Sequence, residues 1–244
     1  MAVVCFGGCY AADPPPGADC ATDNVCPAPL ACSLVTNTCE LHPVALVQQA
    51  TAYAASAPVL SVTLPQVPAA GDVLVMIGAN PDSSLDSVTG AGATWQRAAR
   101  STANANVELW YGTTDGSNDT VTIALAGVTA PMSLEVVEWL GLAPPGVLDS
   151  EVHLAGRTSP ASAGTLSTAA PDLVMFAVGD GGPNTFGIPS PGAWIALASI
   201  DEPGHEQSVW FVAAQTPDTF SPAVTETANH WDAILVGLEL APAD

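Results

Sequence analysis

The stretch AAGDVLVMIGAN, residues 69–80, decides the fold because it recurs 100 residues later as AAPDLVMFAVGD, residues 169–180. Each copy begins with two alanines, a glycine or proline, and an aspartate, which is Asp72 or Asp172. An apolar run as long as a β-strand follows the aspartate. Short apolar runs bounded by glycine, proline and aspartate are typical of β-strands. The pair therefore predicts an all-β protein built from two sequence-related halves.

Four further pairs of segments keep the same order in the two halves. They are residues 90–100 with 189–199, 107–114 with 207–215, 117–127 with 216–226, and 133–142 with 230–240. We expect residues 42–244 to form one antiparallel, jelly-roll-like β-sandwich whose halves, about 61–142 and 165–240, share a single core. The alternative, in which each half is its own domain, would leave four short strands with exposed edges.

The duplication also aligns tryptophans, pairing Trp95 with Trp194 and Trp110 with Trp210. A residue kept at matching positions of two halves is most simply a core anchor, so we expect these four side chains to be buried. The alternative is a sugar-stacking platform, which would expose the rings on one face. The other two, Trp139 and Trp231, have no matched partner, and we expect them to be exposed or to face a ligand.

The repeated elements are similar to a known kind of module. The first half carries GDVLVM, GATW, LWYG and DTVTIAL, and the second carries PDLVMF, PGAW, VWFVA and DTFSPAV. This pattern resembles a module of bacterial exported proteins and phage appendage proteins, and the resemblance covers nearly all of residues 44–241. It implies a jelly-roll-like surface module with no established catalytic activity.

The strong excess of acidic residues limits which molecules this protein can bind. The chain has three arginines, no lysine and 24 acidic residues, which gives a formal net charge of −21, while 48% of its residues are hydrophobic. A protein that binds nucleic acid needs lysine or arginine to neutralise phosphates, so we exclude that class. No apolar run reaches 18 residues, so no membrane-spanning helix is predicted. The predicted partner is an unknown surface glycan or protein.

All six cysteines lie within the first 39 residues, and four of them form a regular cluster: Cys20, Cys26, Cys32 and Cys39. The surrounding segment, residues 10–41, is too poor in large apolar residues to bury a core, so disulfides must hold it as a head or stalk. Zinc is the alternative, but zinc ligands usually come in closer pairs such as C-x2-C. Of the three possible pairings we favour Cys20–Cys32 with Cys26–Cys39, because interleaved bridges constrain a short loop best. Disulfides indicate an oxidising, extracytoplasmic compartment.

The opening residues 1–9, MAVVCFGGC, are expected to be the remnant of a signal peptide. FGGC resembles a bacterial lipobox, which implies that the natural gene starts upstream and that the mature protein begins at a lipidated Cys9. Residues 9–39 are similar to the head of myxobacterial surface lipoproteins, which also end in NTC. The resemblance implies a location at the cell surface or outer membrane, attached only through lipid. The alternative is a secreted protein in which Cys5 and Cys9 are bridged.

Two acidic residues invite a catalytic interpretation. Glu135 and Glu138 could suggest a glycosidase pair. They are three residues apart in an expected strand, so their side chains point to opposite faces. The pair therefore fails on geometry, although either carboxylate could pair with a distant one.

Metal sites receive similarly little support. His205, His230 and Asp232 suggest a cluster, but further ligands cannot be named, and surface histidines are favoured. The loop TDGSND, residues 114–119, offers Asp115, Asn118 and Asp119 as oxygen ligands, yet it lacks the ligand register of a calcium loop, so a plain turn is favoured over calcium.

No arrangement of serine, histidine and aspartate and no phosphate-binding loop is evident, so we expect neither catalytic residues nor a cofactor. The sequence favours a non-catalytic structural or binding module at the cell surface. The alternatives are a carbohydrate-binding module, a filament or phage-tail-like assembly subunit, and a secreted hydrolase. A hydrolase would need two carboxylates that face one cleft.

Overall fold

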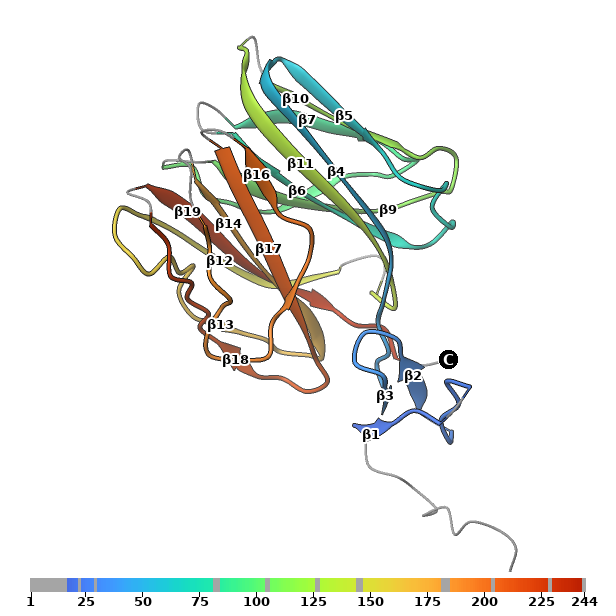
Figure 1. Ribbon diagram of the computed structural model, residues 1–244. Coiled ribbons are helices and arrows are strands. Elements are labelled where there is room, and N and C mark those ends of the chain that lie inside the picture. Colours follow the sequence, from blue (N-terminus) through green and yellow to red (C-terminus); the bar gives the residue numbers. More distant parts are fainter. Residues whose placement is uncertain are drawn as a thin grey trace, which may run out of the picture.

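The computed structural model describes most of the chain beyond residue 16, and all of its regular structure is β (Figure 1). The described residues are 17–21, 23–28, 30–80, 84–103, 106–125, 128–143, 147–180, 185–202, 205–227 and 230–242. All pairings between the strands are antiparallel, which confirms the predicted all-β class. This part of the chain contains no helix of the length and apolarity that crossing a membrane requires.

The first half is a sandwich of two sheets. Its large sheet has the order β4 (Ala45–Ala57), β11 (Ala130–Leu140), β6 (Val73–Ala79), β9 (Val107–Thr113) and β8 (Gln96–Arg100). Its small sheet has the order β5 (Val59–Thr63), β10 (Thr120–Leu125) and β7 (Leu85–Gly90). The first strand of the half therefore lies beside the last, and the second strand pairs with the last but one, which is a jelly-roll arrangement.

The second half repeats this order. Its large sheet contains β12 (Leu148–Gly156), β19 (Trp231–Glu239), β14 (Asp172–Asp180), β17 (His205–Ala214) and β15 (Ile195–Ala196), and β16 (Ile200–Glu202) also pairs with β17. Its small sheet is the pair β13 (Leu166–Ser167) and β18 (Thr219–Phe220). Each matched sequence block thus occupies the corresponding strand, with β6 and β14 at the centre of their sheets.

The large sheets of the two halves pack face to face, which gives four layers in place of the expected two (Figure 1). Val75 and Ile77 of β6 share this central core with Met175 of β14 and Val236 of β19. Each half has in addition its own core beneath its small sheet. The halves share a core, as expected, but it is not a single one, because each half also encloses a core of its own. The all-β, sandwich-like fold built from two related halves is confirmed, with a roll in each half instead of one roll across both.

The apolar runs of β6 and β14 account for the additional layers. Every residue of β6 and of β14 is buried, so both faces of these strands are covered. A strand in a two-layer sandwich faces water on one side and alternates apolar with polar residues, whereas a strand covered on both faces is apolar throughout. The unbroken run VLVMIGA was therefore the signal for a further layer.

The head is a small sheet of three short strands in the order β1 (Ala18–Asp19), β3 (Thr38–Glu40) and β2 (Ala31–Ser33). Disulfides join Cys20 to Cys32 and Cys26 to Cys39, which confirms the favoured pairing. The sulfur atoms of Cys20 and Cys26 lie 4.0 Å apart, so the two bridges pack against each other. Cys5 and the proposed lipid site Cys9 lie outside the described residues.

The head is fastened to the body of the molecule through the linker that follows it. The backbone of His42 donates to and accepts from the side-chain amide of Gln215, at 3.2 and 2.9 Å. The hydroxyl of Ser33, a buried residue of the head, donates to the carbonyl oxygen of Val44 in the linker. These contacts connect the disulfide-bonded segment with both halves of the sandwich.

Candidate functional site

A pocket of about 400 Å³ lies where the head meets the first half. Its walls come from the head, the start of β4, the start of β6, the end of β11 and the C-terminal segment, with Leu34, Ala45, Val73, Leu140 and Pro242 among them. Most of these side chains are aliphatic. Pockets of this size and character are the usual sites for small ligands in proteins.

A close crossing of two chain segments shapes this pocket. The pairing of β11 with β4 shifts register between Glu138 and Trp139, which re-aims the end of the strand. Gly141 then turns the chain with a φ of +93°, and a Cβ there would lie 2.1 Å from the carbonyl oxygen of Pro43. Only glycine permits this approach. The end of β11 can therefore cross the linker that connects the head to β4.

Trp139 forms the inner wall of the pocket. Its side chain has no exposed surface, and its ring meets that of Phe211 edge to face, with centroids 4.9 Å apart. Its indole Nε1 is buried and has no hydrogen-bond partner. The expectation that Trp139 is exposed is wrong, because the second half covers it, but the residue does line the pocket.

The same expectation fails completely for Trp231. Its side chain is 6% exposed and belongs to the core of the second half, and its Nε1 donates to the carbonyl oxygen of Thr158. The indole lies over Gly156, where a Cβ would come within 2.2 Å of the ring. Trp231 is therefore a packing residue that needs glycine beneath it.

A pair of carboxyl groups stands at the edge of the pocket. Burial, followed by the hydrogen bond to Glu138 and the charge of Glu138, raises the pKa of Asp72 to about 6. Glu138 is 1% exposed and accepts hydrogen bonds from the Gln48 side chain and from the Ala69 backbone. With these donors fixed on Glu138, a proton that joins the two carboxyl groups resides on Asp72, and it does so below about pH 6.

The duplicated aspartate has a similar environment. Asp172 is fully buried at the start of β14. Burial, together with the neighbouring Asp149 and Glu239, raises its pKa to about 8. The two matched aspartates therefore both sit among other acids, a likeness of environment that the sequence alignment alone did not predict.

Glu135 and Glu138 project from opposite faces of β11, as predicted from their spacing. Glu135 is completely buried on the face of β11 that meets the second half. Burial raises the pKa of Glu135 to about 8, and the backbone amide of Ala198 opposes part of this effect. At neutral pH the side chain is mostly a neutral acid. It is sealed inside the interface and does not share a cleft with Glu138.

The buried contact between Ser133 and His205 is structural. The hydroxyl of Ser133 lies 2.7 Å from Nε2 of His205 and donates to Oε1 of Gln207 at 2.6 Å. Since the hydroxyl proton is used on Gln207, the His205 nitrogen must donate, so the imidazole cannot act as a base toward Ser133. Both residues have no exposed surface, and burial lowers the pKa of His205 to about 4. The chain of hydrogen bonds joins the two halves.

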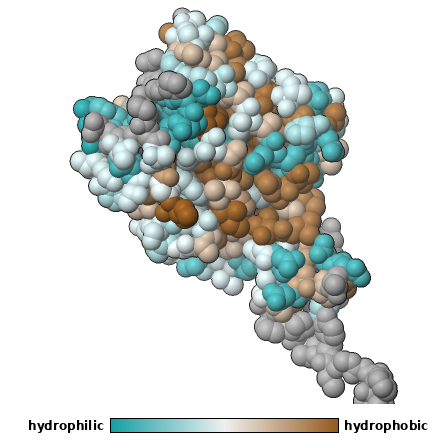
Figure 2. Space-filling view, viewed as in Figure 1, coloured by the Kyte–Doolittle hydropathy of each residue, from teal (hydrophilic) through white to brown (hydrophobic). Residues whose placement is uncertain are grey.

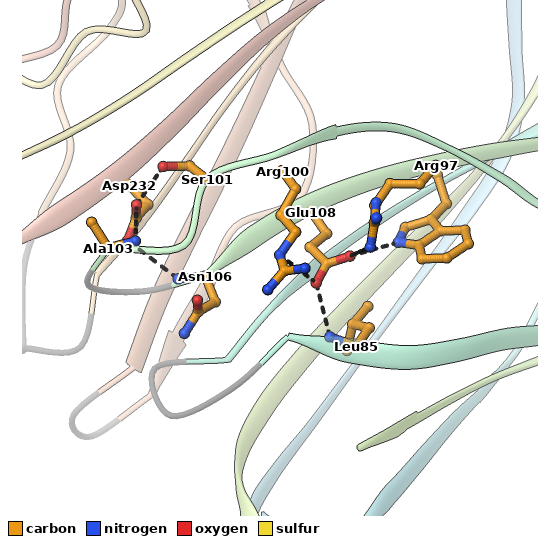
Figure 3. Close-up of polar contacts among 9 residues, drawn as sticks. Leu85, Arg97, Arg100, Ser101, Ala103, Asn106, Glu108 and Asp232 are labelled. Atoms are coloured by element: carbon orange, nitrogen blue, oxygen red, sulfur yellow. Dashed lines mark hydrogen bonds and ion pairs between the residues drawn. The ribbon is translucent and has the colours of Figure 1, made fainter. Parts of the chain in front are cut away.

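Asp232, which was considered as a metal ligand together with His205 and His230, instead joins the two halves through hydrogen bonds (Figure 3). Its carboxylate accepts hydrogen bonds from the Ser101 hydroxyl and from the backbone amides of Ala103 and Asn106. The predicted metal partner His205 instead contacts Ser133 in the interface. Among the described residues, the only group with metal-ligand spacing is Cys20, Cys26 and Cys39, whose sulfurs form the disulfides. His205 is buried, so the surface position favoured for it is wrong.

Two of the three arginines serve another buried carboxylate, Glu108 (Figure 3). Arg97 and Arg100 each place a nitrogen 3.6 Å from a Glu108 oxygen. The backbone of Leu85 and the indole of Trp110 also donate to Glu108, at 2.8 and 3.1 Å. Two of the three positively charged side chains of the protein therefore lie beside Glu108, on β8 at the edge of the large sheet of the first half.

The four matched tryptophans are divided between the halves. Trp194 and Trp210 are buried at 9% and 5% exposure, as predicted. Trp95 and Trp110 are only partly buried against the core of the first half. No described tryptophan, tyrosine or phenylalanine is among the exposed residues, so the described part of the chain presents no exposed aromatic strip.

The acidic loop forms the plain turn that was favoured. Oδ1 of Asp115 accepts from the Ser117 backbone, and hydrogen bonds from the side chain and then the backbone of Ser117 lower the pKa of Asp115. Oδ1 of Asn118 accepts from the backbones of Ala91 and Thr120. The side-chain oxygens are therefore used to hold the loop.

Comparison with family models, curated proteins and solved structures finds no match to this chain. The candidate site therefore rests on its own geometry. Sequence reasoning singled out Trp139 but missed Asp72, although its place in the duplicated run was a usable signal.

Proposed function

We propose that the chain is a non-catalytic binding module that is displayed at a bacterial cell surface. The observation that supports this best is the head, which two disulfides close and which meets the sandwich at an apolar pocket. Disulfides persist in oxidising compartments outside the cytoplasm. The hydrogen bonds of Ser133, Glu108 and Asp232 are used to hold the sandwich together, and none of the three lines the pocket.

Display would follow from a lipid on Cys9, as the lipobox resemblance implies. A diacylglyceryl thioether together with an acylated amine supplies the two or more chains that stable anchoring needs. No basic patch is then required, which agrees with a chain that has three arginines and no lysine.

The test is metabolic labelling with an alkynyl fatty acid. The gene is expressed together with the sequence upstream of it in a bacterium that exports lipoproteins, beside Cys9→Ser and the matched control Cys5→Ser. We expect label on the wild type and on Cys5→Ser, and none on Cys9→Ser. Label that survives Cys9→Ser, or an unlabelled protein in the medium, would contradict surface display through this cysteine.

One observation favours a second candidate, an assembly subunit. β4 ends the large sheet of the first half, and its 13 residues include no charge and no proline. Its counterpart β12 carries Asp149 and Glu151, which protect an edge from pairing with another strand. Sedimentation should show larger species that Thr51→Lys on β4 removes and Thr122→Lys on β10 does not. A monomer at all concentrations would refute this candidate.

A further inference from the structure

We infer that two copies of this chain associate as a closed dimer, in which their β4 strands pair antiparallel about a two-fold axis at Thr51. This pairing joins the five-stranded large sheets of two first halves into one sheet of ten strands. The inference rests on the second candidate function, the assembly subunit, and it names the partner and the geometry of the contact. It does not depend on a lipid at Cys9.

The first support is the open edge of β4. Among the described strands, β4 ends the large sheet of the first half and pairs only with β11, which lies next to it in Figure 1. Leu46 and Val47 of β4 are 38% and 50% exposed. Figure 2 shows a hydrophobic surface directly above the head, where β4 begins. An edge with unpaired backbone groups and exposed apolar side chains is a template for another strand.

The distribution of charge favours a second copy as the partner. No Asp, Glu, Lys or Arg lies between Glu40 and Asp72, a span that contains both β4 and β5. The opposite edges of these two sheets and the matching edge of the second half are charged, with Arg97 and Arg100 on β8, Asp86 on β7, and Asp149 and Glu151 on β12. Two copies that each carry a formal charge of −21 repel each other least where charge is absent. A basic partner would be attracted more strongly to the acidic surface elsewhere.

The register of β4 places the two-fold axis. β4 pairs with β11 without interruption from Gln48 to Ala54, and the register shifts on either side of this stretch. Bulges bend a strand and disrupt its pairing, so the regular stretch is the part that a further strand can extend, and Thr51 is its centre. The exposed residues of β4 lie symmetrically about this centre: Thr51 itself, then Val47 and Ala55, then Leu46 and Ser56. An axis at Thr51 therefore brings exposed residues of one copy against exposed residues of the other.

The experiment is disulfide cross-linking of the full chain with Cys5→Ser and Cys9→Ser as background. The other four cysteines are bridged, so an introduced cysteine is the only free thiol. Thr51→Cys should form a covalent dimer on mild oxidation, because a residue on the axis faces itself at the distance that a disulfide needs.

Two further cysteines test the direction of the strands. Val47→Cys alone should give little covalent dimer, but it should cross-link when mixed with Ala55→Cys, its partner across the axis. Val59→Cys on the neighbouring edge strand β5 is the matched control, because Val59 and Val47 are 49% and 50% exposed. We expect Val59→Cys to remain monomeric.

Sedimentation of the same background without an introduced cysteine completes the test. It should show monomers and dimers with no larger species, and higher salt should tighten the dimer because it screens the repulsion between the copies. Thr51→Lys should weaken the dimer about tenfold or more, because like charges would face each other across the axis, and Thr51→Ser should not. Circular dichroism confirms that each variant is folded.

Three results would overturn the inference. Covalent dimers of Val47→Cys alone as abundant as those of Thr51→Cys would indicate parallel pairing, and dimers through Val59→Cys would indicate the wrong edge. Both results would leave the assembly candidate standing, whereas a monomer at all concentrations would end both. Fatty-acid labelling at Cys9, which tests display at the cell surface, is independent of all three.

Discussion

Replacing Glu135 with glutamine should change how the stability of the protein depends on pH. The carboxyl group is completely buried between the halves, and burial raises its pKa from 4.5 to about 8. Because the folded state holds the proton more tightly than the unfolded state, this group favours folding fully below pH 4.5. That contribution is lost as the pH rises toward 8. Glu135→Gln removes the titration and keeps the shape of the side chain.

The expected size follows from the shift in pKa. Each pKa unit corresponds to about 1.4 kcal/mol, so moving from pH 5 to pH 8 should cost the wild type about 3 to 4 kcal/mol through this one group. The variant has an amide in the same place, and any cost of burying that amide does not depend on pH. The difference in unfolding free energy should therefore move by this amount in favour of Glu135→Gln as the pH rises.

The assay is urea unfolding at pH 5, 6, 7 and 8, followed by tryptophan fluorescence and circular dichroism. Asp72, Asp172 and His205 also have shifted pKa values, but they are present in both proteins and cancel in the difference. Asp86→Asn on β7 is the matched control, because it makes the same change from acid to amide on a side chain that lies in solvent. A difference for Glu135→Gln that is the same at all four pH values would refute the reasoning.

Three further predictions follow from the packing and the bridges. Trp210→Ala should destabilise the protein by about 3 to 5 kcal/mol in urea unfolding, and Trp110→Ala, which removes a half-exposed ring, by clearly less. Asp232→Ala leaves three donors without the acceptor they use here and should lower stability by about 2 to 4 kcal/mol, with faster exchange of the Ala103 and Asn106 amides; unchanged exchange of these two amides would count against the role of Asp232 in joining the halves. Mass spectrometry of unreduced peptides should find Cys20 with Cys32 and Cys26 with Cys39, and a different pairing or free thiols would contradict the fold of the head.

Much of the fold could be predicted because it depends on short-range patterns. The matched blocks predicted which strands correspond, since an apolar run between turn residues defines a strand whatever its neighbours are. The bridge pairing was predictable because four cysteines in twenty residues leave few ways to close a compact loop. The number of layers was not, because it depends on what covers the second face of β6 and β14.

The candidate site was harder to predict because its residues come from distant segments. Asp72 meets Glu138 only through the pairing of β6 with β11, and Ser133 meets His205 only after the two halves have packed. Neither contact leaves a local motif in the sequence. The misassigned Trp139 shows the same limit, since an unmatched tryptophan can equally be exposed or sit where two halves meet.

The two halves have the same strand order, but their own cores are filled by different kinds of side chain. The first covers its large sheet with three strands, β5, β10 and β7, and its own core is mainly aliphatic. In the second, β13 and β18 have only two residues each. Aromatic rings fill that space: Phe176 lies near Trp210 and Trp194, and Phe186 and Phe220 cover those two indoles from the side, with centroids 5.7 to 6.5 Å apart. Large rings bury more area per residue than aliphatic side chains, so a core with fewer strands above it can still exclude water. This agrees with the matched tryptophans being buried in the core of the second half and only partly buried in the first.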